Sequence, residues 1–137
     1  MFKQAKYIYV ARNPKDVVVS FLFHCRGFAS FGAPDLKVDE LIEPMAYGEI
    51  SFGNHCDHVS EWYKARNENN VLFLLYEEMK ADLKGNVMKI AKFLGKSEIL
   101  LKDDGKLWEE IVHKCSFTSM SKSKETYWVG KRLKSIF

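Results

Sequence analysis

Two apolar runs stand out along the chain, and both have the length of a β-strand. Residues 7–11 read Tyr-Ile-Tyr-Val-Ala, rich in the aromatic and β-branched residues that favour strands, and residues 71–76 form an almost uninterrupted apolar run. Such a run is typical of a parallel strand buried on both faces. Because helical patterns separate the two runs, we expect a parallel pair joined by a right-handed crossover.

Between and after these runs, apolar residues recur at helical spacing. The pattern predicts helices over residues 14 to about 27, 38–46, 54–66 and 86–94, with Gly95 as a stop signal, and another that opens at Asp104 or Gly105. Residues 28–53, which surround the short second helix, have scattered apolar positions and several glycines. We expect this long segment to form either a lid over a substrate or an ordinary surface loop.

The turn after the first apolar run carries the clearest candidate chemistry. Arg12 follows the strand, Asn13 offers a helix-capping oxygen, Pro14 suits the first helical position, and Asp16 lies in the first turn. A guanidinium at the carboxyl end of a strand, beside the start of a helix, is a typical binding site for a phosphate. Ser20, two turns later, adds a hydroxyl donor. In the alternative interpretation, Arg12 caps a neighbouring helix or pairs with Asp16.

Composition narrows the class of protein. The chain has 137 residues, a net charge of +3, 47% hydrophobic and 28% charged residues, as expected of one soluble globular domain. The charge is too small to indicate a nucleic-acid partner, and the apolar runs are too short to span a membrane.

The cysteines and histidines predict neither disulfides nor a metal site. Cys25, Cys56 and Cys115 are odd in number and widely spaced. The cluster at residues 55–58, His-Cys-Asp-His, lacks the further ligands that zinc needs, so it is better interpreted as the start of a helix. A reduced, cytoplasmic location is therefore predicted.

Five stretches, in order, resemble the cytosolic sulfotransferases. Residues 7–20 resemble the family's 3′-phosphate-binding segment, and residues 58–63 resemble its D-H-V-x-x-W-W/Y helix. The other three are similar to its I-L-F-L-x-Y-E-D-M-K, I-A-x-F-L-G and T-S-F-x-x-M motifs, at residues 71–80, 90–95 and 115–120. The resemblance covers about residues 5–120, and residues 121–137 form a divergent basic tail.

The resemblance implies an α/β fold of the P-loop-NTPase-like, three-layer sulfotransferase type, with parallel central strands flanked by helices. It implies transfer of a sulfuryl group from 3′-phosphoadenosine 5′-phosphosulfate (PAPS) to the hydroxyl or amine of a small-molecule acceptor (a phenol, alcohol or amine), with no metal. The implied PAPS-binding residues are Arg12 and Ser20 for the 3′-phosphate, and Tyr76, Cys115, Ser116, Phe117 and Met120 for the nucleoside. Phe21 and His24 fall where the family's helix borders the acceptor pocket.

The departures from the family pattern limit these expectations. The family's T-Y-P-K-S-G-T-x-W loop and R-K-G-x-x-G segment match no part of the sequence, and its catalytic histidine matches none of His24, His55, His58 and His113. We therefore expect residues 1–137 to be a partial sulfotransferase domain without transferase activity of its own. The alternatives are a relative of the P-loop nucleotide kinases and a non-catalytic nucleotide-binding or interaction fragment.

Overall fold

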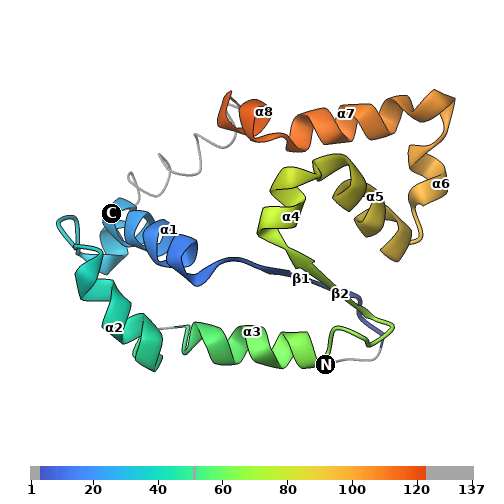
Figure 1. Cartoon of the computed structure of the whole chain (residues 1–137). Helices are drawn as coiled ribbons and strands as arrows, with labels where there is room; N and C mark the ends of the chain where they lie inside the picture. The colour runs from blue at the N-terminus through green and yellow to red at the C-terminus, as the bar shows by residue number, and fades with distance from the viewer. Residues whose placement is uncertain (1–3, 51, 123–137) are drawn as a thin grey trace. The chain divides into compact units, whose positions relative to one another are not determined.

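The computed structural model describes residues 4–50 and 52–122, and these fall into two compact units (Figure 1). The first unit comprises residues 4–11 and 65–122, and the second comprises residues 12–64, without residue 51. Most of the predicted basic tail, residues 123–137, lies outside the described residues.

A parallel strand pair is the centre of the first unit. β1 (Tyr7–Ala11) pairs with β2 (Val71–Leu75) in a register that runs from Tyr7 opposite Val71 to Ala11 opposite Leu75. Just before β2, the side-chain amide of Asn70 donates to the Ala5 carbonyl at 2.9 Å. The predicted parallel pairing is confirmed.

Burial of the strands is less complete than predicted. In β2, Val71 and Leu74 are buried, whereas Ile8 and Val10 in β1 are 40% and 43% exposed. Val71 and Leu74 point to opposite faces of β2, so the predicted burial on both faces holds for most of the second run and ends at Leu75, which is 40% exposed.

Helices make up the rest of the first unit. They are α4 (Tyr76–Ala81), α5 (Leu83–Phe93), α6 (Ser97–Leu100), the 3₁₀ turn η2 (Asp103–Gly105), α7 (Lys106–Cys115) and α8 (Phe117–Lys122). The predicted helices at 86–94 and after Asp104 are confirmed, and Gly95 has the left-handed φ of 69° that ends α5. The sequence pattern missed α4, α6 and α8. It also placed Tyr76 in the strand, because the apolar run continues through the point where the backbone turns into a helix.

A compact polar junction holds α4 against α5. Asp82 caps α5, since its Oδ1 accepts the Gly85 N–H at 2.8 Å. Asn86 is only 2% exposed, and its amide donates to the Asp82 carbonyl at 2.7 Å and to the Glu78 carbonyl at 3.2 Å. These bonds join the end of α4 to the first turns of α5.

The second unit is helical. It contains α1 (Pro14–Gly27), the 3₁₀ turn η1 (Ala29–Phe31), α2 (Asp39–Tyr47) and α3 (His55–Lys64). Its buried side chains are Leu22 and Cys25 of α1 and Leu41 and Met45 of α2. The predicted helices of this segment are confirmed with their ends shifted by one or two residues.

A single asparagine connects α2 to α3. Asn54 donates to the Ala46 carbonyl at 2.7 Å, and its Oδ1 accepts the N–H groups of Cys56 and Asp57 at 2.8 and 3.2 Å. Gly48 ends α2 with a left-handed φ of 74°, and a Cβ at this position would lie 2.8 Å from the Asn54 nitrogen. The turn therefore requires glycine for both its conformation and its space. Within residues 4–50 and 52–122, no helix is both long and apolar enough to cross a membrane.

Candidate functional site

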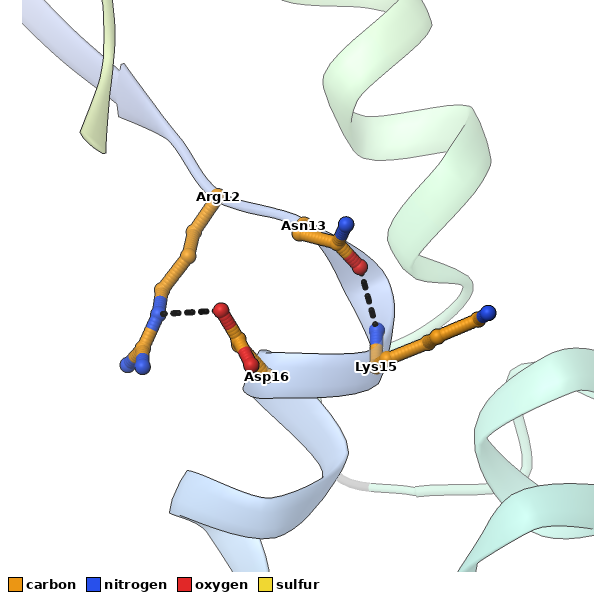
Figure 2. A network of polar contacts seen from close by, with 4 residues as sticks. All are labelled: Arg12, Asn13, Lys15 and Asp16. Carbon is orange, nitrogen blue, oxygen red and sulfur yellow. Dashed lines mark hydrogen bonds and ion pairs between the residues drawn. The ribbon is translucent and has the colours of Figure 1, made fainter. Parts of the chain in front are cut away.

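The first turn of α1 is built as the sequence predicts. The Asn13 Oδ1 accepts the Lys15 N–H at 3.0 Å, so Asn13 caps the helix, and Pro14 occupies the first turn (Figure 2). Arg12 directly precedes this cap, and its Nε lies 4.0 Å from the Asp16 Oδ2. The pairing with Asp16, which the sequence left as an alternative, is therefore present, at the long limit of an ion pair.

This pairing is made by the Nε of the Arg12 guanidinium. Figure 2 shows Asp16 beside the Nε of Arg12, with the two terminal nitrogens of the guanidinium extending past that contact. The side chain of Arg12 is 34% exposed, and that of Asp16 is 57% exposed. A pair at the 4.0 Å limit between a half-buried arginine and an exposed aspartate contributes little to stability, so it is compatible with Arg12 binding an anion.

A pocket of about 310 Å³ opens beside Arg12 in the second unit. Its lining residues are Arg12, Val17, Ser20, Phe21, His24 and Phe52. Both residues expected to bind the 3′-phosphate and both residues expected to border the acceptor are therefore in one pocket. The spacing explains this, because residues 17, 20, 21 and 24 share one face of a helix. We name it the arginine pocket.

Aromatic rings form the apolar wall of the arginine pocket. Phe21 meets the ring of Phe52 edge-on at 5.9 Å between ring centroids, and it meets Phe31 in the same way at 6.1 Å. The ring of His24 is supported by Phe28 and Phe31, which do not line the pocket, with centroid distances of 4.1 and 5.4 Å. The pocket thus combines a cation and a hydroxyl with a ring-lined surface.

A second pocket, of about 320 Å³, lies in the first unit. Its lining residues are Tyr76, Met79, Lys80, Leu83, Cys115, Ser116, Phe117 and Met120. All five residues that the resemblance assigns to the nucleoside are among them. We name it the aromatic pocket.

The aromatic pocket presents an unusually exposed ring. Phe117 is 78% exposed at the start of α8, and Met120, one turn later, is 45% exposed. The Oγ of Ser116 accepts the Ser119 N–H at 3.2 Å, which fixes the turn that carries Phe117. An exposed aromatic face beside a pocket fits a planar base, because stacking needs one open π surface.

Sequence reasoning missed five lining residues. Met79 and Lys80 follow Tyr76 at helical spacing, so recognising α4 would have found them, whereas Leu83 is the first residue of α5. Val17 shares the helix face of Ser20 and Phe21. Phe52 carries no comparable local signal, because only the fold of residues 28–53 brings it to α1.

No metal site is apparent in the described part of the chain. Among residues 4–50 and 52–122, no three or more His, Cys, Asp or Glu side chains are grouped so that they could hold a metal ion.

Comparison with known proteins gives a consistent result. A family model described as "Sulfotransferase domain" matches residues 1–130. The chain is 40% identical over 93 residues to Sulfotransferase 2B1 of Mus musculus, covering 68% of this chain and 27% of that protein. It is 34% identical over 124 residues to Sulfotransferase 1E1 of Bos taurus, covering 90% of this chain and 40% of that protein.

Solved structures agree. The mouse sulfotransferase SULT7A1 complexed with PAP is similar at a TM-score of 0.75 and 34% identity, covering 88% of this chain and 41% of that one. Retinol dehydratase, in complex with androsterone and the inactive cofactor PAP, is similar at a TM-score of 0.74 and 29% identity. The match covers 85% of this chain and 32% of retinol dehydratase. The predicted fold class is thereby confirmed, and the nucleotide kinase alternative finds no support in these comparisons.

Proposed function

The chain belongs to the sulfotransferase domain family, and from this membership we propose that it recognises PAPS and its product adenosine 3′,5′-bisphosphate (PAP). The chain spans 27–40% of the length of the curated relatives described above, so the transfer reaction is part of the proposal. When bound, PAPS supplies the sulfuryl group that passes to an acceptor. The residues of this chain bind and orient the nucleotide.

One observation supports the proposal. The residues predicted to bind the 3′-phosphate line one pocket, and the residues predicted to bind the nucleoside line another. In the arginine pocket, Arg12 and Ser20 offer the charge-assisted donors that a phosphate needs. In the aromatic pocket, Phe117 offers an exposed ring for the adenine, with Tyr76 and Met120 beside it.

The strand register supports this assignment. Ala11 is opposite Leu75 in the parallel pair, and the next residues along the chain are Arg12 and Tyr76. Both proposed ligand-binding segments thus begin where a strand ends, and ligands of open α/β sheets bind at the carboxyl ends of the strands.

The acceptor is proposed to be a small molecule with a hydroxyl or amine. The rings of Phe21, His24 and Phe52 in the arginine pocket support an apolar or aromatic acceptor body. We also propose a cytoplasmic location, supported by three cysteines that are all free thiols in the structure.

Titration with PAP tests the proposal. The chain should bind PAP more tightly than adenosine 5′-monophosphate, which lacks the 3′-phosphate, and more tightly than ATP. Arg12→Ala should weaken PAP binding by roughly ten- to 150-fold, because a hydrogen bond to a charged group contributes about 1.5–3 kcal/mol. The same substitution should leave binding of the monophosphate nearly unchanged.

The matched control is Lys89→Ala, which removes one exposed cation of α5 outside both pockets. If both variants lose PAP affinity equally, the effect of Arg12→Ala comes from the net charge of the chain and not from a specific contact with the 3′-phosphate. A chain that prefers ATP to PAP would refute the proposed function.

A further inference from the structure

The second unit contains a larger pocket that the proposed function does not use. It has a volume of about 570 Å³ and lies among the three helices of the unit. Its lining residues are Pro14, Lys15, Val18 and Val19 of α1, Val38, Ile42, Met45 and Ala46 at α2, and His55 and Cys56 of α3. It shares no lining residue with the arginine pocket. We name it the three-helix pocket.

The wall of the three-helix pocket is apolar and accessible. Val18 and Val19 supply the side from α1, and Met45, which is buried, supplies the floor from α2. Ile42, Val19 and Val38 are 55%, 46% and 40% exposed, so lining residues of both α1 and α2 are open to solvent. Its volume falls within the range of about 300–1,000 Å³ that is usual for sites that bind small molecules. The body of a matching ligand is therefore apolar.

The lining is almost entirely apolar, and over the part of the chain that the structure describes, Lys15 is its one lysine or arginine. Pro14 and Lys15 are the first residues of α1, and His55 and Cys56 are the first residues of α3, so two helix N-termini reach the same pocket. The N-terminus of a helix carries a partial positive charge.

Lys15 adds a full charge at this point. Figure 2 shows its side chain directed away from Arg12 and Asp16. Among the described residues, the Lys15 ammonium makes no ion pair. Four acidic residues are next in sequence to lining residues, Asp16, Asp39, Glu43 and Asp57. None of them lines the pocket, and Asp16 faces Arg12 instead.

We propose that the three-helix pocket binds a small apolar anion, of which a medium-chain carboxylate is the simplest example. The aliphatic chain lies along Val18, Val19 and Ile42, and the carboxylate lies at Lys15. Because the Lys15 ammonium attracts a carboxylate, the pocket should bind this ligand more tightly than a neutral lipid or alcohol of the same length. The site is separate from PAP recognition.

Cysteine alkylation reports on this pocket directly. Cys56 is an exposed thiol on its lining, and Cys115 is an exposed thiol of the aromatic pocket. Cys25 is 4% exposed, and burial raises the pKa of its thiol, so it should react slowly with iodoacetamide throughout. Mass spectrometry of the peptides measures the three rates in the same sample.

The expected result is selective protection. Decanoate, kept below its micellar concentration, should slow alkylation of Cys56 several-fold and leave Cys115 unchanged, while decanol at equal concentration should protect Cys56 less. Lys15→Met should weaken the apparent decanoate affinity about two- to fivefold, and Ile42→Ser roughly tenfold, because one removes an exposed charge and the other an apolar contact. Decanol binding should not change in Lys15→Met.

Three outcomes would overturn the proposal. They are equal protection by decanol and decanoate, equal slowing at Cys56 and Cys115, and undiminished decanoate protection in Lys15→Met. The comparison of decanoate with decanol uses the unaltered chain, so it does not depend on whether a variant folds. PAP titration of the same sample distinguishes failure at this pocket from failure of the proposed function.

Discussion

Replacing Phe117 by alanine is the sharpest test of the proposed adenine site. The ring is 78% exposed, so truncation removes almost no buried area and should leave the free energy of unfolding nearly unchanged. A fully buried phenylalanine would instead cost about 3–5 kcal/mol on truncation. Stacking of a base on an aromatic ring is worth roughly 1–3 kcal/mol, so PAP affinity should fall about five- to 150-fold. Loss of affinity without loss of stability is the expected signature.

The assay is calorimetric titration of Phe117→Ala with PAP and with ribose 3,5-bisphosphate, which lacks the base. Only the first affinity should fall, because the ring acts on the adenine. Phe117→Tyr should retain most of the affinity, since it keeps the π face. The matched control is Phe23→Ala, which removes another exposed phenylalanine, 66% accessible on α1 and outside all three pockets.

Two results would refute the reasoning about Phe117. If both ligands lose affinity equally, the residue acts on the fold or on the phosphate rather than on the base. If Phe23→Ala weakens PAP binding as much as Phe117→Ala, exposure of the ring rather than its position in the aromatic pocket determines the effect.

Two further predictions concern the backbone and capping contacts of the fold. Gly48→Ala should destabilise the chain by more than about 1 kcal/mol in urea unfolding, because φ is 74° and the new Cβ would lie 2.8 Å from the Asn54 nitrogen. Gly27→Ala is the control, since no atom lies within 4 Å of its Cβ position, and any comparable loss there would contradict the argument. Asp82→Ala should cost about 0.5–2 kcal/mol by removing the cap on the Gly85 N–H. Asp82→Asn keeps an acceptor oxygen, so it should cost less, and equal losses would show that the cap is not the cause.

Much of the local structure could be predicted from short stretches of sequence. The strand at residues 7–11, the cap by Asn13, the start of α1 at Pro14 and the stop at Gly95 all depend on neighbours within one or two turns. These elements are caused by side-chain shape, by capping oxygens and by a glycine with a left-handed conformation. All three are properties of residues that are close together in sequence. The same holds for the order of motifs that marks the family, which is read along the chain.

Predictions failed where a local sequence pattern was compatible with more than one backbone conformation. Tyr76 continues an apolar run, yet its backbone begins α4. Phe117 belongs to no clear helical pattern, yet it opens α8. Short helices are marginal on their own, so tertiary packing decides whether they form.

The order of residues along the chain is enough to identify the family, the strand–turn–helix element at Arg12 and most of the residues proposed to bind the nucleotide. Three features follow from the folded chain alone: the register that places Ala11 opposite Leu75, the position of Phe52 in the arginine pocket and the three-helix pocket itself. These features join residues dozens of positions apart, and their stability comes from contacts that form only when the intervening chain has folded. Periodicity and capping describe neighbours along the chain, so they carry no information about such partners.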